Sequence, residues 1–300
     1  MFTGISAFPL TPFTDDQLDE AAYIGMIERL RETRVDSITA MGSTGSYAYL
    51  SLDERSRVIE LAIEHAGDTP VFAGIGALRT SQVLAAARNA ERAGAAGLLL
   101  APVSYQPLTD HDVYELFVAV TAEVSVPVIV YDNPGTTRFS FSLELIERIA
   151  ALPGIASIKI PGVPLDLDTA RARVQAYRSA VPGHVTLGVA GDAFATTGLL
   201  AGCDAWYSVV GGTLPQIAQE VLRAARTGEV PRAEAASQRL APLWELFAEF
   251  GSIRVIAAVA EQLGFARRSS LPLPIQGLDA AARARVAESL EQVALGGRIA

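Results

Sequence analysis

The basic residues of this chain are divided very unevenly between arginine and lysine. Lys159 is the single lysine among 24 Lys and Arg residues, which leaves 23 arginines. An arginine keeps its proton in a protein, whereas a lysine can lose its proton and attack a carbonyl carbon. Lys159 lies near the end of the apolar run 155–161, which is typical of a buried strand. Composition alone is equally compatible with Lys159 being a leftover lysine on the surface. Its apolar neighbours favour a buried nucleophile.

Other groups that can do chemistry lie where predicted strands end. Residues 42–45 read Gly-Ser-Thr-Gly, a loop whose amides and hydroxyls suit a carboxylate, although an ordinary turn has the same composition. Tyr131 ends another predicted strand, where a buried tyrosine is usually a core residue. Gly191 and Asp192 follow a third strand, and an aspartate there can also be a helix cap.

Taken together, an amine, a phenol and a hydroxyl-rich loop suit a Schiff-base enzyme that acts on a 2-oxo acid. Lowering the pKa of a lysine from about 10.4 to between 7 and 8 costs roughly 4 kcal/mol of differential solvation. An apolar strand end supplies that desolvation. The imine is an electron sink at C2, so C3 can lose a proton or a carbon substituent while the tyrosine shuttles the proton.

The elements that must position these groups follow a repeating pattern. Apolar runs recur roughly every 20 to 35 residues with helical segments between them, which is the βαβ rhythm. Eight such units predict an α/β fold of the TIM (β/α)₈ barrel type, with active-site groups at the carboxyl ends of the strands. A doubly wound open sheet is the alternative, but its glycine-rich fingerprint after the first strand is missing. The predicted strands are 4–8, 37–40, 71–74, 97–101, 126–131, 155–160, 185–189 and 205–209.

The helical segments carry their own signals. Tyr23, Met26, Ile27 and Leu30 follow the spacing of one helix face, and residues 51–54 form a capping box. From about residue 215 only helical patterns remain, so we expect the barrel at 1–227 and a small helical C-terminal domain at 228–300.

That C-terminal region has its own predicted boundaries. Its last helix is expected at 279–295, capped by Asp279 and terminated by Gly296 and Gly297. Pro272 and Pro274 predict an extended connector before it.

Composition narrows the classes of partner. The 300 residues are 50% hydrophobic and carry a formal charge of −9, which argues against nucleic acid and anionic lipid as partners. Neither a signal peptide nor a membrane span is visible, so we expect a cytoplasmic protein. Cys203 is the single cysteine and the three histidines are scattered, so we expect no structural metal. Cys203 is more typical of a buried hydrophobe than of a nucleophile.

The motifs in order along the chain resemble the dihydrodipicolinate synthase and N-acetylneuraminate lyase superfamily. The resemblance implies that Lys159 forms the Schiff base, that Tyr131 transfers protons and that Ser43 relays them. It also implies that Thr44 holds the pyruvate carboxylate, that no cofactor is needed and that the protein is a homotetramer built from tight dimers. The matching segments are 1–4, 10–13, 42–45, 131–134, 158–159 and 191–192, and the C-terminal helices resemble that family's extra domain.

Several positions depart from the synthase pattern. Ser46 stands where the family commonly has glutamate, and Thr136 stands where an arginine holds the second substrate's carboxylate. Arg138 lies two residues further on, where it can reach a substrate or serve at the surface. Tyr105 is displaced by one position from the tyrosine that the synthase lends across its dimer, because Ser104 precedes it.

Tyr207 is the remaining departure, because it adds bulk on the eighth strand where small residues are usual. It can narrow the pocket or add a hydroxyl. We count Tyr207, Arg138, Tyr105, Gly45, Gly191 and Asp192 with Thr44 as candidate substrate-binding residues.

The pyruvate half of the site is thus intact by resemblance, and the second-substrate half is changed. The leading hypothesis is a Schiff-base lyase that acts on pyruvate or a 2-oxo sugar acid by aldol cleavage, condensation or dehydration. Dihydrodipicolinate synthase activity is the second hypothesis. A catalytically silent 2-oxo acid binder is the alternative of another class. A metal- or flavin-dependent barrel is disfavoured, since clustered ligands and a basic phosphate site are missing from the sequence.

Overall fold

The eight predicted strands are present and close into a parallel barrel. The computed structural model describes residues 1–294 of the chain. The strand order is β1-β10-β9-β8-β7-β6-β5-β4, and β4 pairs with β1 to complete the ring. The sequence-based barrel prediction is confirmed. The barrel strands are β1 (Gly4–Ala7), β4 (Ser37–Ala40), β5 (Val71–Gly74), β6 (Gly97–Leu100), β7 (Val128–Tyr131), β8 (Ile155–Ile160), β9 (Thr186–Val189) and β10 (Ala205–Ser208).

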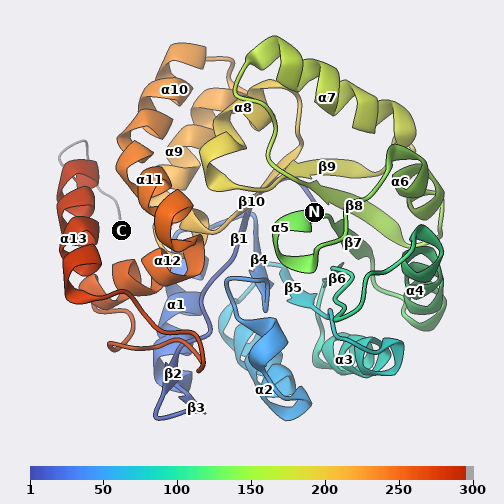
Figure 1. Cartoon of the computed structure of the whole chain (residues 1–300), viewed down its shortest axis with the longest axis horizontal. Coiled ribbons are helices and arrows are strands. Elements are labelled where there is room, and N and C mark those ends of the chain that lie inside the picture. The colour runs from blue at the N-terminus through green and yellow to red at the C-terminus, as the bar shows by residue number, and fades with distance from the viewer. Residues whose placement is uncertain (295–300) are drawn as a thin grey trace.

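Helices alternate with these strands and surround them, as Figure 1 shows. A short hairpin and the four-residue helix α5 after β7 were not expected from the sequence. The hairpin consists of β2 (Phe13–Thr14) and β3 (Gln17–Leu18). The helices up to the end of the barrel are α1 (Glu20–Glu32), α2 (Leu52–His65), α3 (Thr80–Ala93), α4 (Asp110–Glu123), α5 (Pro134–Thr137), α6 (Leu143–Ala150), α7 (Leu167–Ala180), α8 (Ala195–Leu200) and α9 (Pro215–Arg226). Single 3₁₀ turns are η1 (Tyr47–Tyr49), η2 (Asp192–Phe194) and η3 (Val210–Gly212).

Local sequence signals explain where these helices begin and which face they bury. The four apolar residues predicted for one face of α1 are all buried. Ser51 caps α2, and its hydroxyl and backbone amide exchange hydrogen bonds with Glu54 as the capping box requires. The Asp279 carboxylate accepts a hydrogen bond from the Ala282 amide, which confirms the predicted cap of the last helix.

The remaining helices gather on one side of the barrel, next to α1 and α9 (Figure 1). They are α10 (Val230–Arg239), α11 (Ala241–Phe250), α12 (Ser252–Gln262) and α13 (Ala280–Ala294). Leu10 and Met26 from the start of the chain pack with Ile256, Ala260 and Leu271, which attaches this group to the barrel.

The boundary expected near residue 228 falls in the turn between α9 and α10, and a separate domain there stays a prediction. Residue 295 and the predicted terminator Gly296-Gly297 lie outside the described residues. No helix within residues 1–294 combines the length and the apolar character needed to cross a membrane.

The barrel interior is filled by large side chains rather than by a pore. A buried cluster there joins eight residues from five of the strands and the ends that follow them. Tyr207 occupies much of this space because its neighbour in β9 is Gly188, where a Cβ would overlap the tyrosine ring. The cluster consists of Phe8, Phe72, Leu99, Ala101, Ile129, Tyr131, Ala205 and Tyr207.

Candidate active site

Lys159 lies at the carboxyl half of β8, inside the barrel mouth. It pairs in register with Tyr131 of β7 on one side and with Gly188 of β9 on the other. The lysine is only 3% exposed. The sequence-based expectation of a buried lysine on a strand is therefore confirmed, and the alternative of a leftover surface lysine is wrong.

Aromatic rings surround the Lys159 amine. Its Nζ lies 3.8 Å from the ring centroid of Tyr131 and 4.0 Å from that of Phe8, with the Tyr207 ring further away at 5.7 Å. Burial lowers the pKa of Lys159 to about 7, and the charge of Asp192 opposes part of that shift. A substantial fraction of the amine is therefore free of its proton near neutral pH, and the free amine is the form that attacks a carbonyl.

Phe8 is a site residue that the sequence reasoning missed. It follows β1, and its ring reaches the amine because Gly42 opposite has no side chain; a Cβ at Gly42 would overlap the ring. The available signal was strand alternation, because Phe8 lies two residues after the inward-facing Ser6.

The Tyr131 phenol lies in a small hydrogen-bond network. Its hydroxyl accepts a hydrogen bond from the Asn133 side-chain amide at 2.7 Å and lies 3.4 Å from the Ser43 hydroxyl. The same amide lies 3.5 Å from the Ser43 oxygen. Burial raises the pKa of Tyr131 to about 12, and these hydrogen bonds limit the rise. Asn133 belongs to the motif at 131–134 but is not among the site residues that the sequence predicts.

The loop after β4 presents the predicted hydroxyls. Ser43 and Thr44 both line a cavity at the barrel mouth, and Thr44 is buried. Gly45 is required for packing, since a Cβ there would lie 2.9 Å from the backbone of Met41. Ser46 adopts a left-handed backbone with φ 57°, which costs on the order of 1 kcal/mol for a residue with a side chain.

Asp192 is buried behind the site. One carboxylate oxygen accepts hydrogen bonds from the Trp206 indole, the Ser208 hydroxyl and the Val209 amide, and the other accepts from the Val210 amide. These four donors match the accepting capacity of a carboxylate. The geometry therefore indicates that Asp192 connects the end of β9 to β10 and places a charge near Lys159, rather than binding substrate.

Gly191, which precedes Asp192, has φ 78°, a conformation that favours glycine.

Tyr207 is buried in the barrel interior near Lys159. Its hydroxyl lies 2.7 Å from the Ser157 hydroxyl. Ser157 and Lys159 share one face of β8, so this pair lies one layer deeper than the amine. The Tyr207 hydroxyl is therefore already bonded, and a role for Tyr207 in narrowing the pocket stays a prediction.

Two predicted residues have exposed side chains. The Arg138 side chain is exposed at the end of α5, and within residues 1–294 it forms no hydrogen bond or ion pair. Tyr105 is 90% exposed in the loop between β6 and α4. Their roles in substrate binding stay predictions.

Cys203 is buried, and burial raises the pKa of its thiol to about 12. A thiolate nucleophile is therefore scarce at neutral pH. Within residues 1–294, no group of three or more His, Cys, Asp and Glu side chains is arranged to hold a metal ion.

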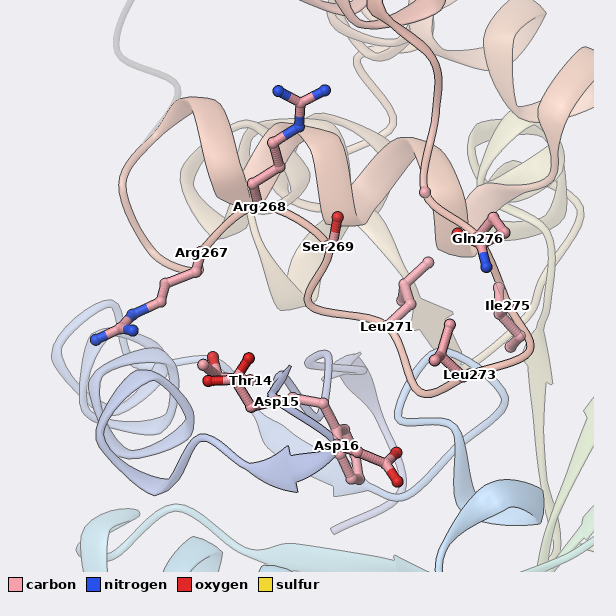
Figure 2. A pocket seen from close by; sticks show the side chains of 12 residues that line it. Thr14, Asp15, Asp16, Arg267, Arg268, Ser269, Leu271, Leu273, Ile275 and Gln276 are labelled. Atoms are coloured by element: carbon pink, nitrogen blue, oxygen red, sulfur yellow. The ribbon is translucent and has the colours of Figure 1, made fainter.

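Besides a cavity of about 430 Å³ lined by Arg55, Gly76 and Val103 among others, two further cavities lie near the carboxyl end of the barrel. The first, of about 380 Å³, is the one that begins at Ser43 and Thr44. The second, of about 240 Å³, lies between the β2–β3 hairpin and the segment that precedes α13 (Figure 2). Its polar walls are the exposed Asp15–Asp16 turn and the exposed Arg267 and Arg268; Figure 2 shows Arg268 pointing away from that turn. Lys159 and Tyr131 do not line this second cavity.

Comparison with known proteins gives consistent matches over the whole fold. The model of the dihydrodipicolinate synthetase family matches residues 1–293. The 4-hydroxy-tetrahydrodipicolinate synthase of Methylococcus capsulatus is 33% identical, with 95% of this chain and 96% of that protein covered. The protein of the same name from Halorhodospira halophila is 31% identical, with 98% of each chain covered.

Solved structures show the same relationship. The dihydrodipicolinate synthase of Agrobacterium tumefaciens superposes with a TM-score of 0.94 at 45% identity, and 98% of each chain is covered. The chloride-inhibited dihydrodipicolinate synthase of Acinetobacter baumannii, solved with pyruvate, has a TM-score of 0.86 at 26% identity. That match covers 97% of this chain and 98% of the other.

Proposed function

The chain belongs to the dihydrodipicolinate synthetase family and is a lyase of that family, and we propose that Lys159 forms its Schiff base with pyruvate or a longer 2-oxo acid. The observation that carries this proposal is the setting of the chain's single lysine. It is buried at a barrel strand end between the rings of Phe8 and Tyr131, with a pKa of about 7. The Acinetobacter baumannii relative was solved with pyruvate, which supports this substrate class.

Imine formation begins when the unprotonated Lys159 amine attacks the C2 carbonyl carbon. The carbonyl oxygen takes one proton from the attacking nitrogen and a second from the Tyr131 phenol and leaves as water, so a protonated imine that keeps one N–H links Nζ to C2. Its positive charge withdraws electrons from C3. Loss of a proton from C3 then gives an enamine.

Proton transfer in these steps falls to Tyr131. Its hydroxyl is held by Asn133 and lies close to Ser43, which provides a short route for protons toward the cavity at the mouth. Because the pKa of Tyr131 is raised to about 12, the phenol rests in its protonated form and donates before it accepts.

Thr44 is assigned to the substrate carboxylate. The family resemblance implies this role, and the buried position of Thr44 beside Ser43 supports it. The amide of Gly45 follows in the same loop.

The enamine has three possible fates that share these residues. Its C3 attacks an aldehyde in aldol condensation, and the reverse reaction cleaves the C3–C4 bond. Alternatively, a hydroxyl on C4 leaves as water, which is a dehydration. Hydrolysis of the final imine releases the product and restores the amine.

4-Hydroxy-tetrahydrodipicolinate synthase activity is the second candidate function. The names of the Methylococcus capsulatus and Halorhodospira halophila relatives favour it. Thr136, at the position that holds an arginine in the synthase motif, argues for a changed second substrate. Turnover of pyruvate with aspartate semialdehyde, followed against pyruvate with other aldehydes, decides between the two.

Borohydride trapping tests the Schiff base directly. Wild-type protein, Lys159→Ala and Lys159→Arg are incubated with pyruvate and borohydride and then weighed as intact proteins. Besides Lys159, the chain has only its amino terminus as a primary amine, so the expected result is one adduct on the wild type alone.

Peptide mapping then locates the adduct. An adduct on all three proteins, or on none with any 2-oxo acid, would overturn the mechanism and leave a silent binder.

The proposed assembly is a homotetramer. Light scattering on the purified protein measures this directly, and a monomeric mass contradicts it.

A further inference from the structure

Tyr47 brings a second phenol to the barrel mouth, and the reaction steps described above leave it unused. It begins the 3₁₀ turn η1 in the loop after β4, it is only 8% exposed, and it lines the same cavity as Ser43 and Thr44. Its ring lies beside the strand ends, because a Cβ at Gly76 after β5 would lie 2.9 Å from Cε2 of Tyr47. Tyr47 therefore belongs to the mouth of the site, although the sequence does not predict it there.

The backbone of Tyr47 is held firmly, while its hydroxyl is not engaged. Its carbonyl oxygen accepts a hydrogen bond of 2.6 Å from the buried Arg55, whose guanidinium carbon lies 5.5 Å from the centre of the tyrosine ring. Within residues 1–294 the Tyr47 hydroxyl forms no hydrogen bond, and its oxygen is not fully buried. These contacts fix the turn and the ring, and they leave the phenol able to exchange protons.

The phenols of Tyr47 and Tyr131 are close enough to influence each other. Burial raises the pKa of Tyr47, the charge that Tyr131 carries as a phenolate raises it further, and the Arg55 cation opposes the rise. The Ser43 hydroxyl lies 3.4 Å from that of Tyr131, and Ser43 lines the cavity together with Tyr47. A proton can therefore pass from one phenol to the other, with Ser43 or a water molecule as the bridge.

Tyr131 needs such a partner because it is only 7% exposed. After it has given its proton to the departing water, Tyr131 is a phenolate, and it takes a proton from C3 of the imine. The proton on Tyr131 is then the one that came from the substrate. It returns to the same carbon unless a neighbouring group exchanges it with solvent. Tyr105, the other phenol predicted for this site, is 90% exposed in the loop between β6 and α4.

We propose that Tyr47 is a positioning residue that relays protons between Tyr131 and the water in the cavity at the barrel mouth, so that one chain supplies the whole relay. In each exchange Tyr131 gives up one proton and takes one back through Tyr47, which is replenished from water, so neither phenol keeps a net charge. The inference rests on the proposed Schiff base at Lys159. It holds for cleavage, condensation and dehydration alike, because all three need Tyr131 to exchange its proton.

Exchange of the C3 hydrogens of pyruvate in D₂O measures the relay directly. Each reversible cycle of imine and enamine formation places deuterium on C3 only if Tyr131 has exchanged with solvent before it returns a proton. The exchange is followed by proton NMR on the wild type and on Tyr47→Phe, which keeps the ring beside Gly76 and removes only the hydroxyl. We expect the exchange rate to fall by about tenfold to a hundredfold in Tyr47→Phe, less than the loss of a proton-transfer group itself.

Borohydride trapping supplies the second readout. Trapping consumes the imine once, so it needs only the proton that Tyr131 already carries at rest. We expect Tyr47→Phe to trap pyruvate at a rate close to that of the wild type, whereas a merely structural defect would slow trapping and exchange together. Tyr114→Phe removes a phenol from the outer helix α4, where the ring lies against Arg148, and as the matched control it should behave as wild type in both measurements.

Three results would overturn the relay while leaving the Schiff base intact. One is exchange at the wild-type rate in Tyr47→Phe. Another is an equal loss of trapping and exchange in Tyr47→Phe, which would show a defect of the loop. The third is a loss of exchange in Tyr105→Phe but not in Tyr47→Phe, which would show that protons enter through the exposed loop.

The proposed function fails in a different way. If the wild type traps a longer 2-oxo acid instead of pyruvate, that acid is used in both measurements. Failure of the wild type to trap any 2-oxo acid overturns the proposed function itself, and this inference falls with it.

Discussion

The Nζ atom of Lys159 lies 4.0 Å from the centre of the Phe8 ring, so the first strand of the barrel supplies one wall around an amine on the sixth. The ring excludes water from the amine, and its negative face partly compensates the ammonium. Burial still prevails, because the pKa of Lys159 falls from 10.5 to about 7. The five predictions below follow from this setting and from the polar groups around it.

The rate of imine formation should depend on pH through Lys159. The unprotonated amine is the nucleophile, so the rate rises with pH and levels off above the pKa of about 7. The measurement is the initial rate of trapping with pyruvate between pH 5 and 9. A rate that keeps rising tenfold per pH unit through pH 9 would show that the amine is solvated like an ordinary lysine.

Lys159→Met should stabilise the protein at pH 7 while abolishing trapping. The folded state holds the amine at a pKa of about 7 and the unfolded state at 10.5, so folding favours proton release. Because the unfolded chain binds more protons between these values, wild-type stability rises with pH across this window and is lowest below pH 7.

Each pKa unit corresponds to about 1.4 kcal/mol, so we expect a gain for Lys159→Met on the order of 2–4 kcal/mol at pH 7. The gain should shrink as the pH approaches 10. Denaturant unfolding at several pH values measures this difference, and a pH-independent difference would contradict the prediction.

Tyr131→Phe should slow imine formation without abolishing it, while turnover falls by about 10² to 10⁴, because the phenol transfers protons both as the imine forms and after it has formed. Asn133→Ala acts through the same hydroxyl. With the 2.7 Å hydrogen bond lost, the pKa of Tyr131 rises further and turnover falls by a smaller factor. Trapping and steady-state turnover are compared on both variants. Turnover at the wild-type level in Tyr131→Phe would assign proton transfer elsewhere.

Tyr207→Phe separates the second tyrosine of the barrel from the first. Its hydroxyl is bonded to Ser157 below the amine, so we expect a stability loss of about 1 kcal/mol and a KM close to wild type. Thermal unfolding and steady-state kinetics measure the two effects. A large rise in KM with unchanged stability would restore Tyr207 as a substrate ligand.

Asp192→Asn should lower the pKa of Lys159 further. The Asp192 charge favours the ammonium, so its removal moves the acidic limb of the trapping profile to lower pH. The asparagine side chain also turns its own N–H groups toward N–H donors that now bond to the Asp192 carboxylate. Losing those hydrogen bonds costs about 1–3 kcal/mol of stability. An acidic limb that moves to higher pH would contradict this electrostatic role.

Much of the fold could be predicted from local sequence patterns. Each barrel strand is a short apolar run, and the burial of such runs is decided within a few residues, so all eight were predictable. The same holds for the Ser51 capping box, whose partners lie three residues apart. Lys159 was identifiable because its residue type is unique in the chain and its neighbours are apolar.

Closure of the barrel decided the rest. Phe8 reaches Lys159 because the barrel closes, with β1 pairing with the last strand, β10, on one side and with β4 on the other. No local pattern indicates this closure. Strand register places the Tyr207 hydroxyl within hydrogen-bond distance of Ser157. Backbone N–H groups of the loop after β10 donate hydrogen bonds to the Asp192 carboxylate. These are contacts between segments far apart in the chain. The sequence by itself therefore determined which groups were available for chemistry, and the tertiary structure decided which of them share the water-poor space around one amine.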